Sequence, residues 1–178
     1  KTPGFDEMFL NVDLEQWLIS AHSLIDRYFE LEDPKSFDPT ELEKFLDHMA
    51  ERESDNTPHV INRFGMMGKY QFAPSTVKIL GFNVTRNQFL TNPELQDSVM
   101  VAYLRSNNKE LNSLITKYEN KVVKGVRVTR SGVLAAAHLA GSTNVKLFFQ
   151  NSDWNGRTDA NGTSIREYMQ TFSIYNLK

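Results

Sequence analysis

Apolar residues recur along much of the chain every three or four positions, which is the spacing of one face of an α-helix. Asp38, Pro39 and Glu41 form an N-terminal signal for one such helix, in a capping-box arrangement, and Gly141 is typical of a helix end. We therefore expect a mainly α fold. The segments with this spacing are 13–32, 38–53, 92–118, 132–140 and 163–172.

The segments between these helices are polar or interrupted by Gly, Pro and Asn. Residues 56–74 are expected to form a loop, with a short helix beginning near Pro74. Residues 121–128 alternate Val with Lys and Arg, which is typical of a short strand or an extended edge. Residues 151–162 are expected to form a polar loop. Loops of this length between helices can border a cleft.

Composition places the chain among ordinary globular proteins. Its 178 residues include 40% hydrophobic residues, and 20 Lys and Arg face 22 Asp and Glu, for a formal net charge of -2. This balance of charges disfavours nucleic acid as a partner. The apolar stretch 133–140 is far shorter than the roughly 20 residues of a membrane span, so we expect no membrane span in this chain. We expect one domain over 1–178, consisting of an N-terminal helical extension (1–37), a core (38–150) and a C-terminal loop and helix (151–178).

Several kinds of site are disfavoured by the residue types present. The chain has no cysteine, which excludes disulfides, Cys-ligated zinc and thiol nucleophiles. A calcium-loop pattern around Asp159 and Gly162 lacks its closing acidic ligand, because that position holds Tyr168. We therefore expect no metal site and no cofactor. The histidines show no metal-binding spacing; they are His22, His48, His59 and His138.

One carboxyl group continues the apolar face of the helix at 38–53. Spacings of 4, 3 and 4 put Glu53 on the same face as Leu42, Leu46 and Met49. Desolvation and the negative end of the helix dipole both oppose the anionic form there, and a protonated carboxyl is what a general acid requires. The alternative is that Glu53 emerges into solvent at the last helical turn.

The residues after Glu53 extend this hypothesis. Glu53-Ser54 is followed by Gly65-x-x-Gly68-x-x-Gln71 and by Pro74-x-Thr76, with Gln71 placed 18 residues after Glu53. This combination resembles the signature of the lytic transglycosylases and goose-type lysozymes. Further parallels lie at 92–97 and 136–141, so the resemblance covers about residues 40–150.

The resemblance implies a lysozyme-like helical domain with a substrate cleft that binds peptidoglycan glycan strands. Glu53 would be its catalytic residue. His138 and Leu139 stand where the family has Tyr and Asn, which makes His138 the replacement donor near the acid, and Lys69 would point to solvent or meet a carboxylate of the peptide stem. The implied substrate-binding residues are Ser54, Met67, Gly68, Tyr70, Gln71, Tyr103 and His138.

The number of carboxyl groups in the cleft separates two chemistries. A hydrolytic lysozyme needs a second carboxylate about 5 to 9.5 Å from the acid. Asp55 and Asp97 are the candidates, but neither stands at a motif position for such a group. We therefore expect a lytic transglycosylase that cleaves the bond between N-acetylmuramic acid and N-acetylglucosamine and leaves 1,6-anhydro ends. A muramidase of the same fold and a non-catalytic peptidoglycan-binding module remain alternatives.

The implied substrate also predicts where the protein works. Peptidoglycan lies outside the cytoplasm, so we expect a periplasmic, cell-envelope or secreted protein, bacterial or phage-borne. The sequence begins at Lys1 rather than Met, and we expect that a signal peptide has been removed. We expect a monomer.

Overall fold

The computed structural model describes residues 37–151 and 162–177. The chain divides into two compact units, Lys1–Ser36 and Phe37–Lys178, and the described residues all belong to the second. The helix predicted at 13–32 lies outside the described residues, as does nearly all of the loop predicted at 151–162.

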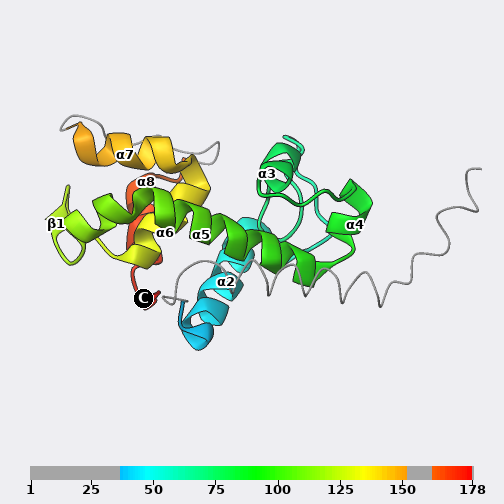
Figure 1. Ribbon diagram of the computed structural model, residues 1–178, viewed down its shortest axis with the longest axis horizontal. Helices are drawn as coiled ribbons and strands as arrows, with labels where there is room; N and C mark the ends of the chain where they lie inside the picture. The colour runs from blue at the N-terminus through cyan, green and yellow to red at the C-terminus, as the bar shows by residue number, and fades with distance from the viewer. Residues whose placement is uncertain (1–36, 152–161, 178) are drawn as a thin grey trace, which may run out of the picture. The chain divides into compact units, whose positions relative to one another are not determined.

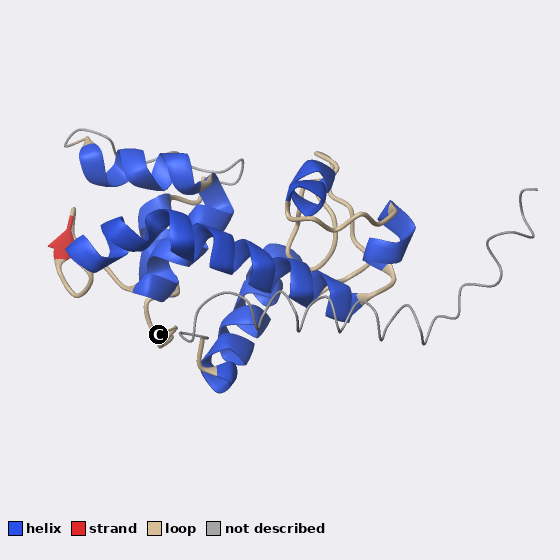
Figure 2. Cartoon of the chain, in the orientation of Figure 1, coloured by secondary structure: helices blue, strands red, loops and turns tan. Residues whose placement is uncertain are grey.

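The described residues are mainly helical, which confirms the predicted fold class (Figures 1 and 2). They form seven α-helices and one two-stranded sheet. The elements are α2 (Pro39–Ser54), α3 (Pro74–Ile79), α4 (Arg86–Leu90), α5 (Pro93–Tyr118), β1 (Val122–Val123), β2 (Val126–Arg127), α6 (Arg130–Ala140), α7 (Ser142–Gln150) and α8 (Ile165–Thr171).

Helix α2 begins with half of the predicted capping box. The side chain of Asp38 accepts a hydrogen bond from the backbone N–H of Glu41 at 3.0 Å. The reciprocal bond is replaced, because the Glu41 carboxylate accepts instead from Lys44 Nζ and from the backbone N–H of Asn176. Helix α2 is thereby joined to the segment that follows α8.

The long helix α5 runs from the loop-rich region of α3 and α4 to the group formed by α6, α7 and α8 (Figure 1). Helices α4, α6 and α7 pack against it, and α8 packs against α6. Small residues allow this last approach, since a Cβ at Gly132 would lie 2.5 Å from the carbonyl oxygen of Met169. The buried face of α5 includes Leu95, Val99, Leu104, Leu111 and Ile115.

Two helices were not predicted. Helix α4 is only one turn long, too short for a periodic pattern, and it is started by a complete capping box between Thr85 and Gln88. Helix α7 begins directly after Gly141, the residue that also ends α6. The expected strand at 121–128 is in fact a hairpin, in which Lys124 and Gly125 form the turn with positive φ values of 51° and 78°.

Candidate active site

A cavity of about 780 Å³ lies between a helical wall and a loop wall. The helical wall consists of Glu53 from α2, Tyr103 from α5, and His138 and Leu139 from α6. The loop wall is the segment 62–73, between α2 and α3. Its cavity-lining residues are Asn62, Arg63, Phe64, Met66, Gln71, Phe72 and Ala73, and Thr76 of α3 completes the lining.

Glu53 enters the cavity from the last turn of α2, with its side chain 17% exposed. Its Oε1 atom accepts a hydrogen bond of 2.6 Å from the hydroxyl of Tyr168, a buried residue of α8. Burial raises the pKa of Tyr168, and the negative charge of Glu53 raises it further. Tyr168 therefore keeps its proton and directs one oxygen of the Glu53 carboxyl group.

His138 lies beside Glu53 but does not donate to it. Its Nε2 atom is 2.9 Å from the backbone oxygen of Tyr70 and 3.9 Å from Oε1 of Glu53. A carbonyl oxygen can only accept a hydrogen bond, so Nε2 of His138 is protonated and donates a hydrogen bond to the backbone oxygen of Tyr70 in the loop wall. The rings of Phe72 and Tyr103 meet the imidazole ring edge-on, with centroids 5.2 and 5.6 Å away.

Hydrogen bonds to its backbone help to hold the loop wall, together with its buried side chains Met67, Tyr70 and Phe72. Met67 and Phe72 exchange two backbone hydrogen bonds of 2.8 and 2.9 Å. The side chain of Gln96, fully buried on α5, accepts from Lys69 N–H at 2.7 Å and donates to the carbonyl oxygens of Pro58 and Phe89. This amide therefore joins α5 to Lys69 of the loop wall, to Pro58 just before the loop wall, and to Phe89 of α4.

Glycine is required at position 68 because the loop wall passes close to Gln96. Gly68 has a φ of 73°, and a Cβ there would lie 2.4 Å from Oε1 of Gln96. Gly65 also has a positive φ, of 79°, but a Cβ at that position would meet open space. The two glycines of the Gly-x-x-Gly pattern thus serve different purposes.

Four of the predicted site residues come together in the cavity wall: Glu53, Gln71, Tyr103 and His138. Gln71 has a φ of 53° and donates from its side chain to the carbonyl oxygen of Gly68 at 2.8 Å. The hydroxyl of Tyr103 donates to the carbonyl oxygen of Ala137 at 2.9 Å. Both side chains are therefore held in place by backbone acceptors next to other site residues.

The other predicted binding residues lie behind the cavity lining. Ser54 donates to the carbonyl oxygen of Lys69 at 2.9 Å and so ties the end of α2 to the loop wall. Met67 is buried and lines a separate cavity of about 220 Å³. Gly68 is buried against Gln96, and Tyr70 is 1% exposed.

The two candidates for a second carboxylate are also outside the cavity lining. Asp55 caps the C-terminal end of α2 and is exposed. Asp97 accepts from the hydroxyl of Tyr70 at 2.5 Å and pairs with Lys69 Nζ at 2.8 Å. Lys69 is therefore occupied by Asp97. Among the described residues, Glu53 is the one carboxyl group that lines the cavity.

Sequence reasoning missed Tyr168, the residue that donates to Glu53. Tyr168 falls within the last predicted helix, 163–172, at an apolar-face position where an aromatic residue ordinarily belongs to the core. A buried tyrosine nevertheless needs a partner for its hydroxyl, and this is the signal that could have marked it. Arg63 and Phe64 were also missed, because the Gly-x-x-Gly pattern begins just after them.

Residues 37–151 and 162–177 contain no cluster of three or more His, Cys, Asp or Glu that could hold a metal ion. Within the same ranges, no helix combines the length and apolar character needed to cross a membrane.

Comparison with known proteins gives one family. The family model described as the transglycosylase SLT domain matches residues 36–159. No curated protein and no solved structure matches the chain significantly. The matched segment includes Glu53, the loop wall and His138, but ends before Tyr168.

Proposed function

Because the chain belongs to the transglycosylase SLT domain family, we propose that it is a peptidoglycan lytic transglycosylase with Glu53 as its acid and base. The family is of the lytic transglycosylase type and acts on peptidoglycan. The bond cleaved is, in this proposal, the β-1,4 bond from N-acetylmuramic acid to N-acetylglucosamine. The observation that carries the proposal is that one carboxyl group of the described residues, Glu53, lies in the cavity lining and is held by Tyr168.

The proposed reaction has two steps, and one carboxyl group serves both. Protonated Glu53 gives its proton to the glycosidic oxygen as the bond from this oxygen to C1 of the muramic residue breaks. The N-acetyl group of the substrate stabilises the positive charge that develops at C1. The Glu53 carboxylate then removes the proton of the C6 hydroxyl while O6 bonds to C1. The product carries a 1,6-anhydro end, and Glu53 is protonated again.

The arrangement around Glu53 supports this route over hydrolysis. A muramidase with a second carboxylate needs that group across the scissile bond. The two candidates for such a group, Asp55 and Asp97, lie outside the cavity lining, and Asp97 is bonded to Tyr70 and Lys69. The 17% exposure of Glu53 also keeps it accessible to a substrate while Tyr168 directs one of its oxygens.

The proposed substrate also assigns a place of action. Peptidoglycan is outside the cytoplasm, so we place the protein in the periplasm, the cell envelope or the medium of a bacterium, acting as a monomer on glycan strands.

The test is the release of soluble fragments from purified peptidoglycan by the wild-type chain and by Glu53→Gln. We expect the substitution to lower the rate by roughly 10²- to 10⁴-fold, the range of general acid–base catalysis. Glu51→Gln is the matched control, because Glu51 is exposed on the same helix and does not line the cavity. Equal rates for wild type and Glu53→Gln would remove Glu53 from the mechanism.

Mass spectrometry of the fragments separates the chemistries. Anhydromuramoyl ends are expected, whereas reducing muramic ends would show a muramidase. Binding without any release of fragments would show a non-catalytic module.

A further inference from the structure

A tight turn at the mouth of the cavity presents a cation and an aromatic ring together. Its conformation is fixed by Asn62, whose side-chain oxygen accepts from the backbone N–H groups of Phe64 and Met66 at 2.8 and 3.1 Å. The backbone of Asn62 also bonds to Met66 and Gly65 at 3.0 and 2.9 Å. Arg63 and Phe64 therefore project from a preformed support.

Arg63 has no ion-pair partner among the described residues. Its guanidinium lies over the ring of Phe64, 4.8 Å from the ring centroid. A cation–π contact of this kind restrains the guanidinium but leaves its N–H donors free for an acceptor. The other cation of the loop wall, Lys69, is occupied by Asp97 and only 13% exposed. Arg63 is therefore the Lys or Arg side chain of the cavity lining that can meet an anion.

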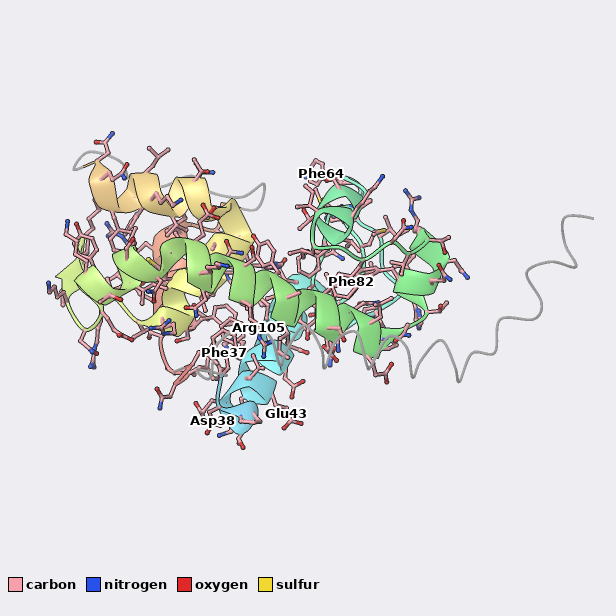
Figure 3. All side chains as sticks on the ribbon, in the orientation of Figure 1. Phe37, Asp38, Glu43, Phe64, Phe82 and Arg105 are labelled. Atoms are coloured by element: carbon pink, nitrogen blue, oxygen red, sulfur yellow. The ribbon has the colours of Figure 1, made fainter. Side chains whose placement is uncertain are left out.

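Phe64 is 59% exposed, although a ring of its size is usually buried. It stands at the outer edge of the loop-rich region in Figure 3. The exposed ring, the unpaired guanidinium and the stable turn occur together at the rim of the cavity that holds Glu53. Isolated exposed apolar residues are common, but this one supports a cation that faces the same cavity.

We propose that Arg63, supported by Phe64, is the subsite for a carboxylate borne on the side arm of a muramic residue. The inference rests on the proposed function, because it assumes that a muramyl glycan occupies the cavity. The sugar rings of such a strand are neutral, and its charge lies on the lactyl arm or on the attached peptide. A guanidinium binds a carboxylate through two parallel hydrogen bonds, and the stacked ring limits the rotation of the arginine side chain.

Two sources could supply this carboxylate. A strand without peptides has a free lactyl carboxylate, whereas in a strand that carries peptides this group is an amide and the carboxylates belong to the stem. Both present the same chemistry at the end of the lactyl arm, and different strands can distinguish them.

The experiment is a binding cycle on the full chain carrying Glu53→Gln, which prevents cleavage during the measurement. Its ligands are glycan strands freed of peptides by an amidase and the same strands with their carboxylates converted to amides by carbodiimide coupling. The proteins are Glu53→Gln alone, its double variant with Arg63→Gln, and a matched control with Arg86→Gln. Arg86 is an exposed cation of α4 outside the lining of the large cavity.

We expect Arg63→Gln to weaken binding of the charged strand about tenfold, the loss of one charge-assisted contact, and to leave binding of the amidated strand unchanged. Amidation of the strand should weaken its binding to the protein carrying Glu53→Gln alone to a similar extent. The protein that also carries Arg86→Gln should bind both strands as the Glu53→Gln protein does. Repeating the cycle with peptide-bearing strands identifies the source: a larger Arg63→Gln effect there assigns the carboxylate to the stem.

Equal weakening of the charged and the amidated strand by Arg63→Gln, or no weakening of any strand, the peptide-bearing strand included, would overturn the subsite. Failure of the proposed function looks different: wild-type protein would release no fragments from peptidoglycan while the coupling between Arg63 and the carboxylate persisted. A protein that binds neither strand would refute both.

Discussion

The two walls of the cavity are held by different forces. The residues of the helical wall stand on α2, α5 and α6, each of which has a buried apolar face, so their positions follow from side-chain packing. The loop wall has little regular structure; besides its buried side chains Met67, Tyr70 and Phe72, it depends on hydrogen bonds to its backbone, including the one between Lys69 N–H and Gln96. Loss of a polar partner in the loop wall should therefore lower the free energy of unfolding. Loss of a polar partner in the helical wall should mainly lower the rate of the reaction.

The largest effect is expected from Gln96→Leu. Leucine fills a similar volume but leaves Lys69 N–H and the carbonyl oxygen of Pro58 without partners, while the carbonyl oxygen of Phe89 keeps only its longer bond from Asn92 N–H. Each unpaired buried group costs about 1–3 kcal/mol, so the free energy of unfolding should fall by about 3–5 kcal/mol. Denaturant unfolding measures it. Gln150→Leu, at an exposed position on α7, should change it by less than about 0.5 kcal/mol; similar losses in both variants would contradict a special role for Gln96.

A smaller loss is expected from Gly68→Ala, with Gly65→Ala as its natural comparison. Both positions have positive φ, which costs alanine about 1–2 kcal/mol. Only at Gly68 would the new Cβ also collide with Gln96 and Phe89. Gly68→Ala should therefore lower the free energy of unfolding by about 2–4 kcal/mol, clearly more than Gly65→Ala. Identical values from the two variants would mean that the backbone angle alone matters.

In the helical wall, Tyr168→Phe should act on the reaction more than on folding. It removes the donor to Glu53 but keeps the ring that packs in the core. We expect fragment release to slow about tenfold, while the free energy of unfolding changes by about 1 kcal/mol or less. Tyr175→Phe is the control, because it also loses one hydroxyl bond, to His48, outside the cavity lining. Equal rates for the two variants would show that the Glu53 contact is unimportant.

The smallest effect concerns alkaline pH and Tyr70, which supports the loop wall. Burial raises the pKa of Tyr70 above its ordinary value of 10.0, and the charge of Asp97 adds to this. As pH rises past 10, the unfolded chain releases this proton while the folded chain retains it, so stability falls. The melting temperature of Tyr70→Phe should therefore decline less steeply than that of wild type between about pH 9 and 11. If the melting temperatures of the two proteins fell equally with pH, the raised pKa of Tyr70 would not be the cause of the loss of stability.

The start of a helix can be predicted because its signal is local, as it was at Asp38. Asp38 before Pro39, Asn92 before Pro93, Thr129 and Ser164 all accept from the first turn of the helices that they precede. A cap and the apolar stripe behind it depend on residues three or four positions apart, so the sequence contains all that is needed. Helix α4 was not predicted, because a helix of one turn is too short to show a periodic pattern of apolar residues.

Residues of the candidate site could be predicted only where they belong to a sequence motif. Glu53 and Gln71 were found from their motifs, and both line the cavity. Tyr70 and Asp97 instead bond to each other behind the loop, and Tyr168 reaches Glu53 from 115 residues along the chain. No spacing rule covers such distances, because they depend on how α5 and α8 pack.

By itself, the sequence determined that the chain forms helices, that Glu53 lies on an apolar face, and that a Gly-x-x-Gly loop follows it. Periodicity, capping and motif spacing depend only on residues that are close together in the sequence, so they can be recognised without the tertiary structure. Only the tertiary structure decided which side chains Glu53 meets, that Lys69 is occupied and Arg63 is not, and that Gly68 must be glycine because Gln96 lies against it. These choices arise from close packing and from the pairing of buried polar groups, which join residues far apart in the chain.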